Sequence, residues 1–298
     1  MKNNTHEPAI FYYQGTTLVP ERNLAFNAQR LLYQSVLGRV LRHLLTNHLA
    51  AAAMGWYHNS QLSQHLIPSF VEAYQINMAD FIIPSGGYAS FNDFFMRAFK
   101  PGVRPLPADQ NTIISPADSK LFVIPYLTPR TSFFVKEHAF DLAKFLGNAT
   151  RAAQFDTGIL CMFRLAPYDY HRFHAPADGV IEQIIRISGK LESVNPVVFM
   201  AGYQPLTTNE RVIILLKTPT VGTIALVAVG ALFVGSITLQ CTVGDVIKRG
   251  DDIGMFAFGG STVVMLFPRD AIRLKEPFIA HSLQGYETAV TMGTAITN

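Results

Sequence analysis

The chain of 298 residues has little charge and little cysteine. Only 15% of its residues are charged, against about 25% in ordinary soluble proteins, and its mean hydropathy is +0.21. A net charge of +3 is too small to predict binding to DNA or RNA, so we expect no nucleic-acid partner. The low charge makes contact with a membrane a hypothesis to test.

Two cysteines, Cys161 and Cys241, lack the spacing of a metal site or a redox motif, so we interpret them as buried, inert thiols. The longest uncharged stretch, residues 218–244, has the length of a membrane-spanning helix. Glycines interrupt it regularly, and Val, Ile and Thr fill the intervals, which favours short buried strands. We therefore expect no transmembrane helix.

No Asp or Glu lies between Glu21 and Glu72. Within this segment an apolar stripe recurs at helical spacing, with arginines largely off it. Two interpretations stay open: the helix covers the protein's own core, or it docks on an anionic membrane. The arginines favour the membrane. Since the N-terminus lacks an apolar signal region, we expect a peripheral protein on the cytoplasmic side. The stripe comprises Leu31, Leu32, Val36, Leu37, Val40, Leu41, Leu44 and Leu45, and the arginines are Arg30, Arg39 and Arg42.

The pattern predicts an α+β protein in two parts. Residues 1–99 are predicted to be mainly helical, with helices over 21–55, from near Pro68, and after an N-cap at Ser90. A Pro-rich stretch, residues 100–110, marks the boundary. Residues 100–298 are predicted to be a β-rich domain, with one clear helix that ends at Gly147.

A weak internal repeat suggests a duplicated β unit. Residues 115–119, SPADS, and residues 175–179, APADG, each place Pro-Ala-Asp in a turn before an apolar strand. Residues 243–254, VGDVIKRGDDIG, are predicted to form a hairpin like those of lipoyl or biotinyl carrier folds. This leaves a non-catalytic, carrier-like binding module as one alternative for the whole chain.

The candidates for chemistry are two histidines and one serine. His171 and His174 could be a metal site, an acid–base pair or surface residues of a turn, and metal is the weakest hypothesis because a third ligand is missing. Ser261 is a candidate nucleophile, and Asp118 and His174 could activate it. The alternative is that Ser261 only shapes a turn. The hydrolase pattern G-x-S-x-G is absent, which argues against an α/β-hydrolase.

Several motifs together resemble the phosphatidylserine decarboxylases. They are YASFNDFFMRAFKPGVRP, SPADS, DYHRFHAPADG, LESVNPVVF, NERVIILL, VGALFVGSI and KRGDDIGMFAFGGSTVVMLF, in that order over residues 88–268. Several motifs in one order are more specific than any one of them.

The resemblance implies a proenzyme that cuts itself between Gly260 and Ser261. Asp118 would orient His174, His174 would deprotonate Ser261, and Ser261 would attack the Gly260 carbonyl. Elimination and hydrolysis would convert Ser261 into a pyruvoyl group, the covalent cofactor and electron sink. His171 is then expected to assist decarboxylation or the protonation after it.

The same resemblance implies phosphatidylserine as the substrate, phosphatidylethanolamine as the product, and a large and a small chain made from one proenzyme. A relative acting on a free amino acid is the closest alternative, and a strand-edge homodimer stays open. Two residues depart from the family pattern: Ser119 stands in place of glycine, and Gly259 in place of an apolar residue.

Overall fold

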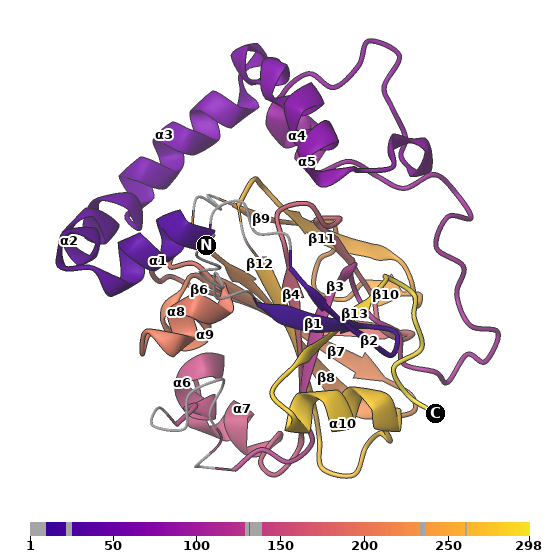
Figure 1. Ribbon diagram of the computed structural model, residues 1–298. Coiled ribbons are helices and arrows are strands. Elements are labelled where there is room, and N and C mark those ends of the chain that lie inside the picture. The colour runs from indigo at the N-terminus through magenta and orange to yellow at the C-terminus, as the bar shows by residue number, and fades with distance from the viewer. Residues whose placement is uncertain (1–9, 22–25, 129–130, 132–138, 233–235, 260) are drawn as a thin grey trace.

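The computed structural model describes residues 10–21, 26–128, 131, 139–232, 236–259 and 261–298. A helical arm extends from a body built on two sheets (Figure 1). The arm contains α1 (Phe26–Gln34), α2 (Val36–Leu45) and α3 (His48–Asn59). Separate N-caps divide these helices: Ser35 Oγ accepts from the Gly38 N–H, and Asn47 Oδ1 accepts from the Ala50 N–H.

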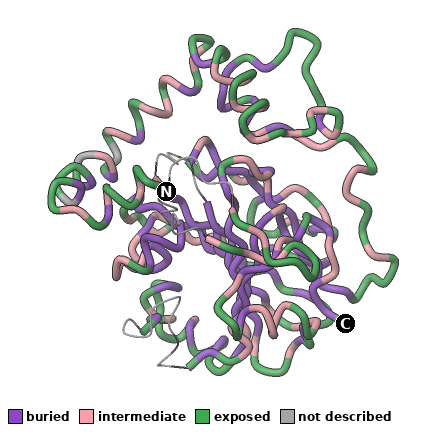
Figure 2. The backbone as a smooth tube through the Cα atoms, viewed as in Figure 1, coloured by how far each residue is buried: buried purple, intermediate pink, exposed green. Residues whose placement is uncertain are grey.

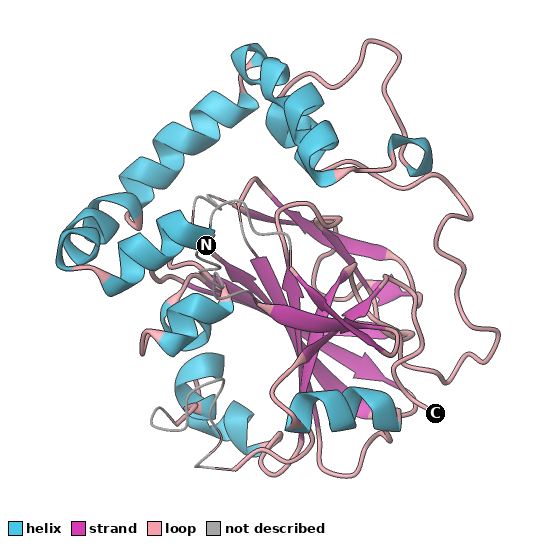
Figure 3. Ribbon diagram, in the orientation of Figure 1, coloured by secondary structure: helices cyan, strands magenta, loops and turns pink. Residues whose placement is uncertain are grey.

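The remaining helices are short. The two between residues 66 and 95 lie next to the end of the arm, and those after residue 141 lie beside the sheets (Figure 3). Two sequence predictions are confirmed: Ser90 caps α5 (Phe91–Phe95) through the Asp93 N–H, and α6 (Leu142–Leu146) ends at Gly147 with φ 67°. These helices are α4 (Leu66–Tyr74), α5 (Phe91–Phe95), α6 (Leu142–Leu146), α7 (Ala149–Ala153), α8 (Pro196–Met200), α9 (Pro205–Thr208) and α10 (Glu276–Leu283), with 3₁₀ turns at Gln61–His65 and Met78–Asp80.

A ten-stranded sheet forms the centre of the body, and a three-stranded sheet packs on one face. Neighbouring strands are antiparallel except β1 and β13, which run parallel. In order across the large sheet the strands are β10 (Val246–Ile247), β6 (Gly179–Ile187), β7 (Arg211–Thr218), β8 (Gly222–Gly230), β12 (Ser261–Phe267), β4 (Ile159–Leu165), β3 (Ser119–Ile124), β13 (Glu287–Val290), β1 (Phe11–Gln14) and β2 (Thr17–Pro20). The small sheet contains β5 (Arg172–His174), β11 (Asp252–Phe256) and β9 (Ile237–Leu239).

Strand β12 shows how the core is divided, because its side chains alternate between the two faces of the sheet. Val263 and Met265 join the cluster that includes Phe173 and Phe256 of the small sheet. Val264 joins the cluster on the other face, with helices α6 to α9. Both faces of β12 are therefore buried, and the body is purple through its centre (Figure 2).

The α+β class is confirmed, with N-terminal helices before a β-rich part. The uncharged residues 218–244 contain β8 and β9, and no helix among the described residues is long and apolar enough to cross a membrane. The predicted hairpin over residues 243–254 is wrong: β10 pairs with β6, whereas β11 pairs with β5 and β9. The division at residue 99 stays a prediction, and β1 and β2 belong to the main sheet.

The two Pro-Ala-Asp turns are related by matching hydrogen bonds. The Ile114 N–H donates to the Pro176 carbonyl at 3.1 Å, and the His174 N–H donates to the Pro116 carbonyl at 2.8 Å. Positions 114 and 116 correspond to positions 174 and 176, so each turn binds the other at equivalent atoms. This exchange supports a duplicated β unit.

Candidate active site

Ser261 opens β12 at the centre of the large sheet. It lies opposite Leu165 of β4 and Gly230 of β8, and its side chain is fully buried. Gly259, two residues earlier, has φ 147°, a region that favours glycine, so the unusual glycine here suits its backbone. Gly260 lies outside the described residues. The predicted cleavage bond therefore joins an undescribed glycine to a buried serine at a strand end.

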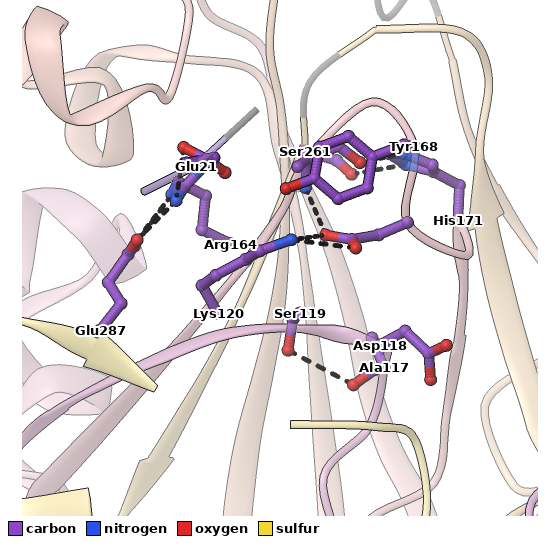
Figure 4. Close-up of polar contacts among 12 residues, drawn as sticks. Glu21, Ala117, Asp118, Ser119, Lys120, Arg164, Tyr168, His171, Ser261 and Glu287 are labelled. Carbon is purple, nitrogen blue, oxygen red and sulfur yellow. Dashed lines mark hydrogen bonds and ion pairs between the residues drawn. The ribbon is translucent and has the colours of Figure 1, made fainter. Parts of the chain in front are cut away.

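His171 is in hydrogen-bond contact with Ser261. Its Nδ1 lies 3.1 Å from Ser261 Oγ (Figure 4). Its Nε2 lies 3.0 Å from the Ala166 carbonyl oxygen. A carbonyl can only accept, so Nε2 carries the proton and Nδ1 presents a lone pair to the hydroxyl. This tautomer can accept the hydrogen of Ser261.

The surroundings of His171 keep it neutral. Phe95 stacks on its ring at 4.0 Å between centroids, and the imidazole is fully buried. Burial and the nearby Arg97 charge lower the pKa of His171 to about 3, because the charged form is poorly solvated. An imidazole with so low a pKa is an available acceptor but a weak base.

His174 has different partners. Its Nδ1 lies 2.8 Å from the Gly250 carbonyl oxygen, and its Nε2 lies 3.0 Å from the Tyr170 hydroxyl. By the same reasoning Nδ1 carries the proton, so Nε2 accepts from Tyr170. Burial lowers the pKa of His174 as well. Residues three apart in an extended chain point to opposite sides, so the two histidines face different partners.

Asp118 closes the first Pro-Ala-Asp turn. Its carboxylate accepts from the Met292 N–H at 2.7 Å and pairs with Arg104 at 2.5 Å. Asp178, at the equivalent position of the second turn, accepts from the Arg249 N–H at 2.8 Å. The carboxylates therefore have matching main-chain partners.

The Asp118 turn also tolerates its neighbouring serine. Ser119 donates from Oγ to the Ala117 carbonyl at 3.3 Å and has no positive φ. Serine in place of glycine therefore leaves the turn intact.

The structure thus brings Ser261 together with His171. Among the described contacts, Ser261 Oγ has no hydrogen bond to His174 or to Asp118. The main-chain bond between His174 and Pro116 nevertheless keeps the Asp118 turn beside His174. The assignment of self-cleavage to these two residues stays a prediction.

Sequence reasoning missed the groups that hold His171 in place. The Asp169 carboxylate accepts from the Ala166 N–H at 2.7 Å and pairs with Lys120 at 2.7 Å, which fixes the turn whose carbonyl binds His171. Phe95 lies in the FNDFF segment, which the family resemblance marks without giving it a role. These residues come from separate segments, so no local spacing signals that they meet.

A buried charge cluster lies beside the nucleophile (Figure 4). Arg164, opposite Thr262 in the sheet, pairs with Glu21 at 3.0 Å and Glu287 at 2.5 Å. The two carboxylates raise the pKa of Arg164 against the effect of burial. Glu21 directly follows the β1–β2 hairpin, so this cluster fixes the chain at the start of the helical arm.

A cavity of about 420 Å³ lies between the arm and the large sheet. Its lining is mostly apolar and includes Leu32 and Leu45 of the arm, Val194, and the backbone neighbours of the cleavage site, Leu165 and Gly259. A mostly apolar pocket of this size with a few polar groups is typical of a ligand site. The cavity therefore reaches the predicted cleavage site.

The helical arm presents much of its apolar stripe outward. Leu37 is 70% exposed, Val40 is 61% exposed, and Trp56 further along is 72% exposed. Arg42, one of the arginines expected to lie largely off the stripe, is buried and pairs with Glu192 of the LESVNP segment. The Arg39 and Leu44 side chains lie outside the described ones. The arm is thus anchored by a buried ion pair while much of its stripe faces outward.

The cysteine interpretation agrees with the structure. Cys161 and Cys241 are both buried and unpaired. Burial raises the pKa of both thiols, that of Cys241 to about 11, which disfavours the reactive thiolate.

Comparisons with known proteins identify the family. The family model for phosphatidylserine decarboxylase matches residues 91–297. A phosphatidylserine decarboxylase proenzyme of Chlamydia trachomatis is 36% identical over 93% of this chain and 92% of its own length. One from Fusobacterium nucleatum is 33% identical over 93% of each chain. Proenzyme 2 of Oryza sativa is 38% identical over 89% of this chain and 44% of its own. The chain belongs to the phosphatidylserine decarboxylase family.

Proposed function

We propose that this chain cuts itself between Gly260 and Ser261 and then converts phosphatidylserine into phosphatidylethanolamine and carbon dioxide. One observation carries the proposal. In a member of this family, a buried serine follows a glycine pair at a strand end and contacts a neutral histidine at 3.1 Å. This contact places a side chain that can hold or move a proton directly at position 261, the residue on which both the cleavage and the decarboxylation depend.

The cleavage exchanges one bond for another before any group is lost. Ser261 Oγ attacks the Gly260 carbonyl carbon, the peptide C–N bond breaks, and an ester links the two chains. Elimination releases the Gly260 carboxylate. Water then replaces the nitrogen at position 261, and ammonia leaves. The products are a large chain ending at Gly260 and a small chain, residues 261–298.

The surroundings of residue 261 fit a pyruvoyl group. When formed, that group supplies the electron sink that takes up the electron pair left when the bond between the substrate's α-carbon and its carboxylate breaks. The residue lies where the apolar cavity reaches Gly259, so a substrate in the cavity can approach it. His171 lies beside the same side chain and is placed to hold or move a proton at position 261. This placement supports a role for His171 in decarboxylation.

The histidine that starts self-cleavage is the open assignment. Family resemblance supports Asp118 and His174, whereas contact with Ser261 favours His171. The low pKa of His171 counts against it as the base, which keeps His174 as our proposal. His171 is the second candidate because its contact is direct.

Two variants separate these assignments. His174→Ala should stay uncut, whereas His171→Ala should be cut but decarboxylate poorly. Denaturing gels follow cleavage, and release of carbon dioxide from phosphatidylserine vesicles follows the reaction. An uncut His171→Ala together with a cut His174→Ala would reverse the two roles.

We propose that the outward stripe of the arm docks on an anionic membrane. Phosphatidylserine carries acyl chains that stay in the bilayer, so the enzyme must work at its surface. The cavity is lined by Leu32 and Leu45 on the same arm, which places the route to residue 261 next to the docking face. A peripheral location on the cytoplasmic side and a homodimer belong to the proposal only as expectations.

Substrate assays distinguish this function from its alternatives. We expect carbon dioxide from vesicles of phosphatidylserine and none from free serine or tryptophan. Activity on the free amino acids alone would instead favour the alternative function, decarboxylation of a free amino acid. A wild-type protein that stays as one chain and releases no carbon dioxide would support the binding module instead.

A further inference from the structure

The connection between β11 and β12 is held by an asparagine from the helical part of the chain. Asn92 Oδ1 accepts from the Phe258 N–H at 2.7 Å, and Asn92 Nδ2 donates to Asn59 Oδ1 at 2.8 Å. The N–H can only donate, so it fixes which end of the Asn92 amide faces the connection. Asn92 is 2% exposed, so water is a poor substitute for this contact.

Phe258 lies two residues before the undescribed Gly260 and outside both strands. Its ring packs between His58, at 4.4 Å, and Phe91 and Phe95, at 5.0 and 5.2 Å. The main-chain anchor from Asn92 therefore acts on a residue whose side chain is already packed against three rings. Together these contacts fix the position of Phe258, three residues before Ser261.

We propose that Asn92 is a positioning residue for self-cleavage, and that Asn59 at the end of α3 holds its amide in the required orientation. The inference rests on the proposed cleavage. Attack by a side chain on the neighbouring carbonyl requires close alignment, and a misplacement of about 1 Å can lower a rate by about a hundredfold. The amide pair also links the arm to the segment that is cut.

The test measures the rate at which full-length protein, freshly made by cell-free synthesis, forms the small chain. Asn92→Ala removes both contacts, and we expect cleavage to slow at least tenfold. Asn92→Asp keeps an acceptor for the Phe258 N–H and should restore much of the rate. Asn59→Ala changes an exposed residue and should slow cleavage severalfold with the fold intact.

Asn148→Ala is a matched control, since Asn148 Oδ1 also accepts a main-chain N–H, that of Arg151, far from the cleavage segment. It should lower thermal stability without changing the rate. Hydroxylamine gives a second readout because it splits the ester that forms between residues 260 and 261. If Asn92→Ala slows formation of this ester, little ester accumulates, and hydroxylamine should release little extra fragment.

Wild-type rates for both Asn92→Ala and Asn59→Ala would overturn the inference. So would equal slowing by Asn92→Ala, Asn92→Asp and Asn148→Ala, which would indicate general destabilisation. If Asn92→Ala does not fold, Asn59→Ala decides the question. A wild-type protein that never cuts would instead refute the proposed function itself.

Discussion

We expect the outward-facing apolar side chains of the arm to contribute a measurable part of the protein's affinity for membranes. Leu37 and Val40 are 70% and 61% exposed. Burying such a side chain fully is worth about 1.5–3 kcal/mol, so the exposed parts of the pair are worth roughly 2–4 kcal/mol. Replacing both by serine should therefore weaken binding to vesicles by roughly 30-fold to several hundredfold, at about 1.4 kcal/mol per tenfold.

Flotation with vesicles of phosphatidylserine and phosphatidylcholine measures this change. The control is the pair Val246→Ser and Val243→Ser, which are 71% and 60% exposed at the β10 edge, away from the arm. The control should bind like wild type, and both double variants should still cut themselves. Equal binding by the two double variants would refute docking through the arm.

Three further predictions concern ionisable side chains. Arg42→Met leaves Glu192 without its cationic partner, so we expect a loss of about 3–5 kcal/mol in the free energy of unfolding by urea. The Asp178→Asn variant should cut itself normally, whereas the Asp118→Asn variant should stay uncut. Equal cleavage of the two variants would indicate that Asp118 only closes its turn, as Asp178 does. The pKa of His171 is about 3 in the folded protein and about 6.5 in the unfolded chain. The contribution of neutral His171 to the free energy of unfolding is therefore fully present above about pH 6.5 and is lost as the pH falls toward 3. His171→Gln should flatten that loss in urea titrations between pH 7 and 5, and an unchanged slope would contradict it.

Local signals in the sequence anticipated the elements that local chemistry determines. Ser90 begins α5 because its hydroxyl caps a free N–H, and Gly147 ends α6 because it adopts a left-handed conformation. Apolar β-branched runs gave β7, β8 and β12. Helices α7, α8 and α9 escaped prediction because four or five residues are too few to show a helical period. Helices α5 and α6 are as short, and their cap residues rather than a helical period indicated them.

Local sequence signals do not show which distant strands pair with one another. Residues 243–254 contain a turn with the composition of a hairpin, yet their strands join different sheets. The candidate residues were found by type, but sequence spacing does not show which face of the chain meets Ser261. His171 occupies that face, and Phe95 and the Ala166 carbonyl hold it there.

The mass of the intact purified protein tests the central claim most directly. The account predicts two chains divided between Gly260 and Ser261, the smaller one spanning residues 261–298 and lighter by one ammonia than the plain peptide. Treatment with borohydride should add two hydrogens to the smaller chain, as expected for a ketone. A single chain of full mass, or a smaller chain that begins with an unmodified serine, would contradict it.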